Sequence, residues 1–198
     1  MARKVMRAGT LLAPVPPALV TVGTMEKHNV LTVAWTGIVC SDPALTYVSI
    51  RPSRYSHALL AEGGEFVIHL PSESQARQVD FCGIYTGAKV DKLKKCRLTA
   101  IPSEEVAAPT IAECPIALEC RVREVRPLGT HDMFLAEIVA VTADEALFDE
   151  KGKLHMERAH LVAYAHGEYY GLGRVLGKFG FSTDKAKKGT RKGGKKKA

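Results

Sequence analysis

The sequence has little cysteine and no long apolar run. Only five of its 198 residues are cysteine, an odd number, and no two of them form a C-x-x-C pair. This usage argues against a disulfide framework and against a zinc ribbon. No stretch of about 18 apolar residues occurs, so no membrane-spanning helix is expected. Pro14, Pro16 and Pro17 interrupt the apolar segment behind the basic N-terminus, which makes a poor signal peptide, and the expected location is a reducing cytoplasm.

Acidic residues are missing from the end of the chain, and this explains the net charge of +7. Eight of the 28 basic residues lie between Lys185 and Ala198, so the remainder is close to neutral. This end also lacks apolar side chains larger than alanine, and therefore cannot bury enough surface to offset the entropy of ordering. We predict one domain over residues 1–183 and a disordered basic tail over residues 184–198. A solubilising tail is favoured, and nucleic acid is not expected as a partner beyond non-specific contacts.

Short runs rich in Val, Thr, Ile and aromatic residues predict β-strands. They cover residues 18–24, 29–38, 44–51, 65–71, 116–125, 131–141 and 160–165. In the run 116–125, alternate residues such as Cys120 are predicted to face the core, and Glu119 and Arg121 the solvent. Short helices are predicted over residues 54–63 and 72–82. The early connections are too short for parallel crossovers, so the expected fold is mainly β, an antiparallel barrel of α+β character with short inserted helices.

Other motif-like patterns carry little weight. Residues 189–196 have the spacing of a phosphate loop, but a lysine replaces the required Ser or Thr and no strand precedes them. The spacing of His155, His160 and His166 matches no compact zinc motif. We therefore predict no metal site. No nucleophile or acid–base residue is singled out as catalytic.

Cationic and hydroxyl side chains gather where a predicted strand meets a predicted helix, at Arg51, Ser53, Arg54 and Ser56. Guanidinium groups, hydroxyls and the free N–H groups of a helix start are the chemistry that binds phosphate. A solvated strand-to-helix corner is the competing interpretation. The basic segment 89–96 could supply a lysine to the same anion, or could form a solvated helix face.

The only tryptophan, Trp35, stands between threonines in "LTVAWTG". A core position is the usual interpretation of a single tryptophan. The neighbouring hydroxyls and Gly37 allow a second interpretation, in which the flat polar ring of a ligand lies against this strand and hydrogen-bonds to its backbone.

The segments "NVLTVAWTGIVCSDPALTYVSIRPSRYSHALL", "GEFVIHLP", "DFCGIYTGAKVDKL", "IAECPIALEC" and "GTHDMFLAEI" follow one another along the chain. In sequence and order they resemble the flavin reductase-like family, and specifically its flavoredoxin branch. The resemblance runs from about Pro14 to Ser182. It implies an FMN-binding split β-barrel that forms a homodimer, with FMN near the subunit interface.

The resemblance also implies cofactor-binding roles for residues at matching positions. The segment that grips the ribityl phosphate corresponds to Arg51, Ser53, Arg54, Tyr55 and Ser56, with Lys92 as a further phosphate contact. The strand and loop that border the isoalloxazine correspond to Asn29, Thr32, Trp35, Thr36 and Gly37. His131 falls near the ring, where it could stabilise reduced flavin or make a structural hydrogen bond. Tyr170, or its neighbour Tyr169, corresponds to the aromatic segment that closes the pocket.

The predicted function is an FMN-dependent oxidoreductase that takes a hydride from NADH or NADPH and passes electrons to free flavin, a metal complex or a protein. In such a protein the cofactor carries the chemistry, while the chain binds and orients it. A second interpretation is a non-enzymatic, flavoredoxin-like carrier with permanently bound FMN. A third is a protein that binds nucleic acid or another polyanion through its basic tail.

Overall fold

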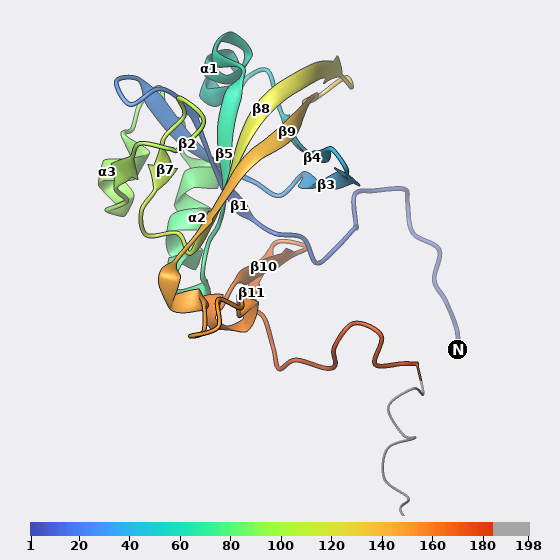
Figure 1. Cartoon of the computed structure of the whole chain (residues 1–198). Coiled ribbons are helices and arrows are strands. Elements are labelled where there is room, and N and C mark those ends of the chain that lie inside the picture. The colour runs from blue at the N-terminus through green and yellow to red at the C-terminus, as the bar shows by residue number, and fades with distance from the viewer. Residues whose placement is uncertain (184–198) are drawn as a thin grey trace, which may run out of the picture.

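A computed structural model describes residues 1–183 of the chain (Figure 1). The predicted tail, residues 184–198, lies outside the described residues. An N-terminal arm without regular structure leads to Val15, which pairs with Tyr164 through two backbone hydrogen bonds of 3.0 and 2.9 Å. Within residues 1–183, no helix combines the length and the apolar character needed to cross a membrane.

A seven-stranded antiparallel sheet dominates the fold. Its strands, in spatial order, are β2 (His28–Val33), β1 (Ala18–Gly23), β5 (Glu65–Leu70), β8 (Ile116–Pro127), β9 (Asp132–Ala143), β4 (Ala44–Ile50) and β3 (Thr36–Ser41). Two small pairs are β6 (Ala100–Ile101) with β7 (Thr110–Ile111), and β10 (Val162–Ala165) with β11 (Glu168–Gly171). The helices are α1 (Tyr55–Gly63), α2 (Ala76–Ile84) and α3 (Lys92–Cys96), with 3₁₀ turns η1 (Glu73–Gln75), η2 (Glu145–Leu147) and η3 (Met156–Ala159). The predicted class, mainly β with short inserted helices, is confirmed.

The two edge strands of the sheet, β2 and β3, are consecutive in the chain and are separated only by Ala34 and Trp35. The run 29–38 predicts a single strand, and that prediction is wrong, because the chain bends between these two residues. Since a two-residue link joins the two ends of the sheet, the sheet has to curve back on itself into a barrel. The N–H of Ser49 donates a 2.9 Å hydrogen bond to the carbonyl of Trp35 at this junction. The barrel is therefore split where β2 gives way to β3.

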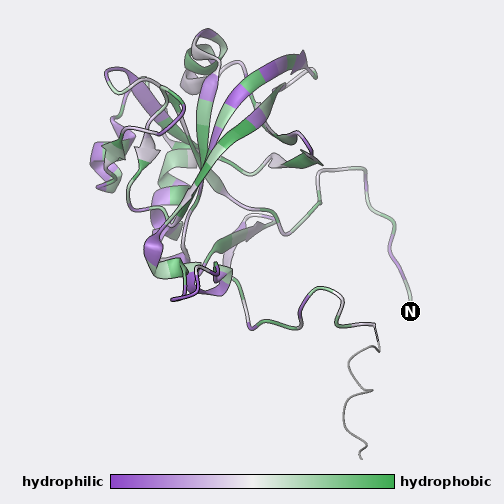
Figure 2. Cartoon of the chain, in the orientation of Figure 1, coloured by the Kyte–Doolittle hydropathy of each residue, from purple (hydrophilic) through white to green (hydrophobic). Residues whose placement is uncertain are grey.

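The barrel interior holds a large apolar cluster, and Figure 2 shows hydrophobic residues along the strands that build it. Its buried side chains include Val20, Val22, Leu31, Val48, Leu60, Phe66, Ile68 and Phe134. The opposite face of the β1–β2 edge is also covered, because Leu19 and Val30 pack with Val79 of α2 and Leu93 of α3. Helices α2 and α3 are thereby fixed beside β2, next to the split.

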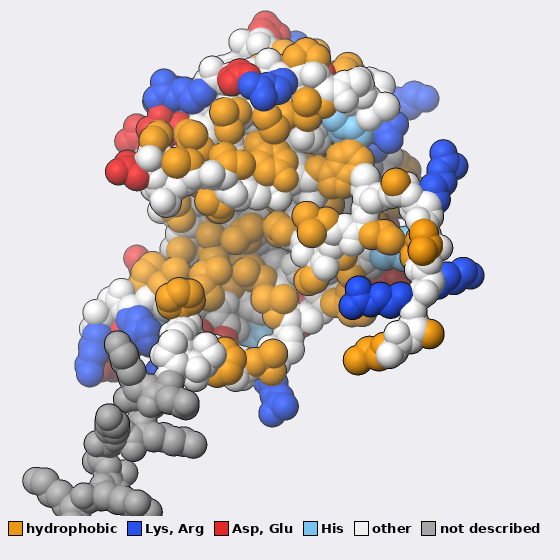
Figure 3. All heavy atoms as spheres, turned by 90° about the vertical axis from the view of Figure 1, so that its right-hand side faces the viewer, with side chains coloured by type: hydrophobic (Ala, Val, Ile, Leu, Met, Phe, Trp, Pro, Cys, Tyr) orange, Lys and Arg blue, Asp and Glu red, His pale blue; other side chains and the backbone are white. Residues whose placement is uncertain are grey.

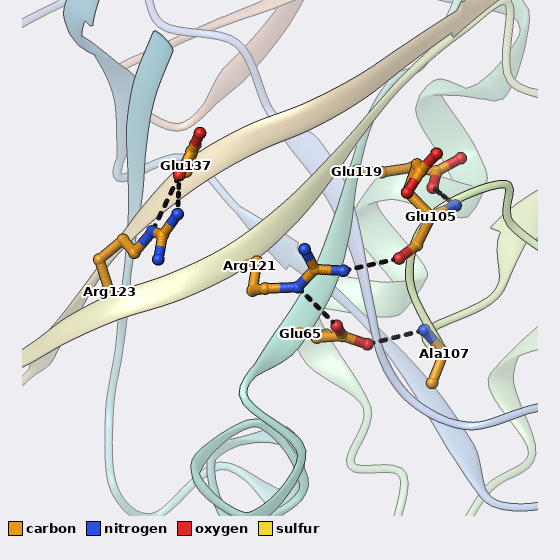
Figure 4. Close-up of polar contacts among 7 residues, drawn as sticks. All are labelled: Glu65, Glu105, Ala107, Glu119, Arg121, Arg123 and Glu137. Carbon is orange, nitrogen blue, oxygen red and sulfur yellow. Dashed lines mark hydrogen bonds and ion pairs between the residues drawn. The ribbon is translucent and has the colours of Figure 1, made fainter. Parts of the chain in front are cut away.

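Glu119 on β8 is predicted to face solvent, and this prediction is wrong, since its side chain is fully buried. Its two carboxylate oxygens accept hydrogen bonds of 3.0 and 2.7 Å from the N–H groups of Glu104 and Glu105. Arg121 donates to the carbonyl of Glu105 and to the carboxylate of Glu65, as Figure 4 shows. The loop between β6 and β7 thus lies over the face of β8 that the period-two pattern assigns to water.

Candidate functional site

A groove opens at the split in the barrel. Its wider part, about 220 Å³, is lined by β2, the β2–β3 bend, the end of β4 and the turn that precedes α1. Its narrower part lies between the start of α1, the end of α2 and Lys92. Leu31, Thr32 and Arg54 border both parts, so the two form one continuous groove.

Lys92 places a buried cation in the narrow part of the groove. Its side chain is only 3% exposed, and its Nζ donates a 3.0 Å hydrogen bond to the carbonyl of Cys82 at the end of α2. Burial lowers the pKa of Lys92 to about 8, and the charge of Arg54 contributes to this. Among the ion pairs of residues 1–183, none includes Arg51, Arg54 or Lys92. A bound anion would supply the negative charge that this buried ammonium lacks.

The start of α1 provides further groups for an anion. Arg54, the N-cap residue, is extended, and its side chain makes no capping hydrogen bond. No acidic residue stands in the first turn. The N–H of His57 donates a 2.9 Å hydrogen bond to the carbonyl of Arg54, whereas the N–H groups of Tyr55 and Ser56 have no partner within the helix. Ser56 is buried, and its Oγ accepts a 2.6 Å hydrogen bond from Nδ2 of Asn29. Hydroxyl, guanidinium and helix-end N–H groups therefore converge beside Lys92, as phosphate binding requires.

The wider part of the groove has an aromatic wall. Trp35 is not a core residue: 42% of it is exposed, and its ring centroid lies 4.2 Å from that of His131, at an angle of 53°. Burial, followed by the charges of Arg51 and Arg54, lowers the pKa of His131, so the imidazole is neutral at pH 7. Its Nδ1 hydrogen-bonds Oγ1 of Thr130 at 2.9 Å. Trp35 and His131 thus give this part of the groove an aromatic surface, of the kind that fits a second aromatic ring, beside the guanidinium groups of Arg51 and Arg54.

Most of the predicted site residues lie together in this groove. They are Asn29, Thr32, Trp35, Arg51, Arg54, Tyr55, Ser56, Lys92 and His131. What each of them binds stays a prediction. The hydroxyl of Thr32 already donates to the carbonyl of Val79 and so helps to hold α2 against β2.

Four of the predicted residues do not line the groove, namely Thr36, Gly37, Ser53 and Tyr170. Thr36 donates a 2.6 Å hydrogen bond to the carbonyl of Tyr47, and Gly37 packs against the Tyr47 ring, so both serve the pairing of β3 with β4. Ser53 is exposed on the turn before α1. Tyr170 lies half exposed on β11, where its hydroxyl donates to Glu168.

The loop after α2 also lines the narrow part, and sequence reasoning did not select it. It contributes Tyr85, Thr86 and Gly87, and Gly83 in the last turn of α2 also lines this part. A Cβ built on Gly87 would lie 2.2 Å from Oδ1 of Asn29, so this position accepts only glycine without a shift of its neighbours. The dipeptide Thr86–Gly87 after a predicted helix is a turn signal, but such a signal does not indicate which element the turn approaches.

The chain matches the family model "Flavin reductase like domain" over residues 11–173. It therefore belongs to this family. A flavoredoxin of Desulfovibrio vulgaris (Miyazaki F) is 34% identical, with a TM-score of 0.84 over 92% of this chain and 99% of that chain. A flavoredoxin from Methanosarcina acetivorans is 27% identical, with a TM-score of 0.82 over 93% and 98% of the two chains. These similarities confirm the predicted family, its flavoredoxin branch and the split-barrel fold.

Two further relatives are informative. An FMN-binding protein from Thermus thermophilus, solved with bound 1-cyclohex-2-enone, is 29% identical, with a TM-score of 0.71 over 86% of this chain and 93% of that chain. An uncharacterized protein of Archaeoglobus fulgidus is 39% identical over 140 residues, which cover 71% of this chain and 78% of the relative. The likeness thus extends over most of the described chain.

Proposed function

We propose that the protein binds FMN in the groove and is an oxidoreductase that takes a hydride from NADH or NADPH and passes electrons to free flavin, a metal complex or a protein. The observation that carries this proposal is the buried Lys92 ammonium, which has no acidic partner within residues 1–183 and lies beside the start of α1. The narrow part takes the phosphate and the wider part takes the ring. The FMN-binding relative from Thermus thermophilus supports the same choice of cofactor.

Different residues of the groove bind the phosphate and the ring of FMN. Arg54, Lys92 and Ser56 hold the phosphate through charge-assisted and hydroxyl hydrogen bonds. Trp35 and the neutral His131 border the ring, and one imidazole nitrogen remains available because the other contacts Thr130. When bound, FMN supplies the hydride and electron transfer, so the chain needs no acid or base of its own.

An absorption spectrum of the purified protein, before and after denaturation, tests the proposal of a flavin cofactor. We expect a yellow protein that releases FMN on denaturation, or a colourless one that takes FMN up. A colourless protein that refuses added FMN would contradict the proposal.

A flavoredoxin-like carrier with permanently bound FMN is the second candidate, and the similarity to two flavoredoxins favours it. Anaerobic addition of NADH or NADPH to the FMN-loaded protein separates the two candidates. Rapid bleaching of the flavin absorbance supports a reductase. No bleaching with either nucleotide, but reduction by another redox protein, supports the carrier.

We also propose that the protein is a homodimer in the cytoplasm. Figure 3 shows hydrophobic side chains gathered on the face that carries β3 and the N-terminal arm, where Ile38 is 67% exposed. The segment after β11 also exposes Leu176 and Phe179. A second copy of the chain would cover such apolar surface, and sedimentation of the FMN-loaded protein tests this. The five free thiols are compatible with the reducing cytoplasm.

A third function is the binding of nucleic acid or another polyanion by the basic tail. The charge of the tail is the one feature that supports it. Removal of residues 185–198 tests this function directly. We expect the truncated protein to retain FMN and electron transfer. Loss of function with FMN still bound would favour the polyanion function.

A further inference from the structure

Two thiols meet beside the narrow part of the groove. Sγ of Cys82, on α2, lies 3.9 Å from Sγ of Cys96, at the end of α3, although the two residues are 14 positions apart. Cys82 is 1% exposed and lines the groove, whereas Cys96 is partly exposed. A disulfide has an S–S length of about 2.05 Å, so closure requires the sulfurs to approach by roughly 2 Å. A side-chain rotation with a small helix shift supplies a movement of this size.

We propose that Cys82 and Cys96 form a reversible disulfide that weakens flavin binding, an inference that rests on the function proposed for the groove. The oxidant is a small-molecule disulfide such as oxidised glutathione. The thiolate of Cys96, the more exposed residue, attacks it and releases one thiol, which leaves a mixed disulfide on Cys96. The sulfur of Cys82 then displaces the second thiol. Two S–H bonds are lost and one S–S bond forms, while two electrons and two protons convert the reagent into two thiols.

The surroundings of the two sulfurs determine how fast this exchange proceeds. Burial raises the pKa of Cys82 to about 12, against the opposing effect of the Lys92 charge, and burial also raises the pKa of Cys96. Since the thiolate is the attacking species, only a small fraction of either residue reacts at pH 7. Oxidation is therefore slow at neutral pH and accelerates as the pH rises.

Closure of the disulfide acts on the groove through Lys92. This lysine is the first residue of α3, and its Nζ is bound to the carbonyl of Cys82. Cys82 and Cys96 pack in the same apolar cluster, and α3, with only five residues, carries Cys96 at its partly exposed end. Closure draws this short helix toward α2, and Lys92 shifts with it from its position in the narrow part.

Displacement of one charge-assisted phosphate contact lowers the affinity for FMN about tenfold. Thermodynamic linkage makes the effect reciprocal, so bound FMN disfavours the disulfide by the same factor. Riboflavin, which has no phosphate, provides the matched ligand whose affinity changes little on oxidation.

Peptide mapping and FMN titration of the full-length protein test the proposal. One sample is kept reduced, and the other is incubated with oxidised glutathione and freed of excess reagent. We expect a peptide that links Cys82 to Cys96, and about tenfold weaker FMN binding that dithiothreitol reverses. The proposal is overturned by the absence of the linked peptide, by a link from Cys82 to Cys114 instead, or by equal FMN affinity of the two forms.

Two cysteine variants show whether the change in FMN affinity depends on the disulfide between Cys82 and Cys96. Cys96→Ser, at a position outside the groove, should bind FMN like the reduced wild type and lose the response to oxidised glutathione. Cys40→Ser should keep the full response. If the reduced protein binds no FMN, the proposed function and the coupling both fail, whereas equal affinity in the reduced and oxidised forms defeats the coupling alone.

Discussion

Nδ2 of Asn29 donates a 2.6 Å hydrogen bond to Oγ of Ser56 and thereby links β2 to the first turn of α1. Both side chains are buried. Gly87, in the loop after α2, lies against the same amide, because a Cβ at this glycine would be 2.2 Å from Oδ1 of Asn29. Three segments that are distant in the sequence thus determine one another's positions at the narrow part of the groove.

The substitution Gly87→Ala is expected to weaken FMN binding at least tenfold. The added methyl group has to displace the Asn29 amide, which disturbs its bond to Ser56, and the lost contacts are worth about 1.5 kcal/mol or more. Flavin fluorescence titration measures the effect. Gly63→Ala is the matched control, since a Cβ there meets nothing within 4 Å, and it should bind FMN normally. Normal affinity of Gly87→Ala would mean that the loop lies farther from Asn29.

Removal of the guanidinium in Arg54→Ala should weaken FMN roughly ten- to a hundredfold without unfolding the protein, because it deletes a charge-assisted phosphate contact of about 1.5–3 kcal/mol. Isothermal titration and a thermal melt measure affinity and folding separately. Arg77→Ala, at an exposed position of α2, is the control and should bind like the wild type. Wild-type affinity in the Arg54 variant would show that another part of the surface holds the phosphate.

The affinity for FMN should fall as the pH rises through about 8, the pKa of Lys92. Below this value the lysine is already charged; above it, the free protein must take up a proton before the ammonium can bind the phosphate. The total decline is about tenfold, the contribution of this one phosphate contact, and the affinity levels off at higher pH. Titrations between pH 7 and 10 measure it. Riboflavin binding should show no such decline. The Lys92→Met variant should bind FMN weakly, and its affinity should not change as the pH rises through about 8.

Glu119→Gln should destabilise the fold by about 1–3 kcal/mol, because the amide can accept only one of the two backbone hydrogen bonds that the carboxylate accepts. The free energy of unfolding in urea measures this loss. Glu105→Gln alters an exposed neighbour and should stay within about 0.5 kcal/mol of the wild type. Equal stability of the two variants would contradict the burial of the Glu119 carboxylate.

The sequence predicts the strands well because most of them are short apolar runs with clear breaks. It does not predict the bend at Ala34 and Trp35, since "NVLTVAWTGI" contains no breaker between its two halves. It also assigns Glu119 to solvent. Local alternation describes only the strand itself and carries no information about a loop that later folds over it.

The candidate site shows the same limit. Arg51, Arg54 and Ser56 are neighbours in the chain, so their shared chemistry is visible as a motif. The burial of Lys92 and the meeting of Cys82 with Cys96 depend on how α2 and α3 pack, which spacing alone does not reveal. Tyr170 rests on the family resemblance alone; it lies on β11, outside the groove of this chain, and its contact with the cofactor stays a prediction.

The split of the barrel has one further consequence. The cleft is bordered by residues 29–35 on one side and residues 49–56 on the other. A molecule bound between them would hold the two sides of the split together and stabilise the folded chain, since it binds the closed barrel and not the unfolded chain. Cofactor supply would then govern the lifetime of the protein as well as its activity, because chains left empty would open more often to proteases.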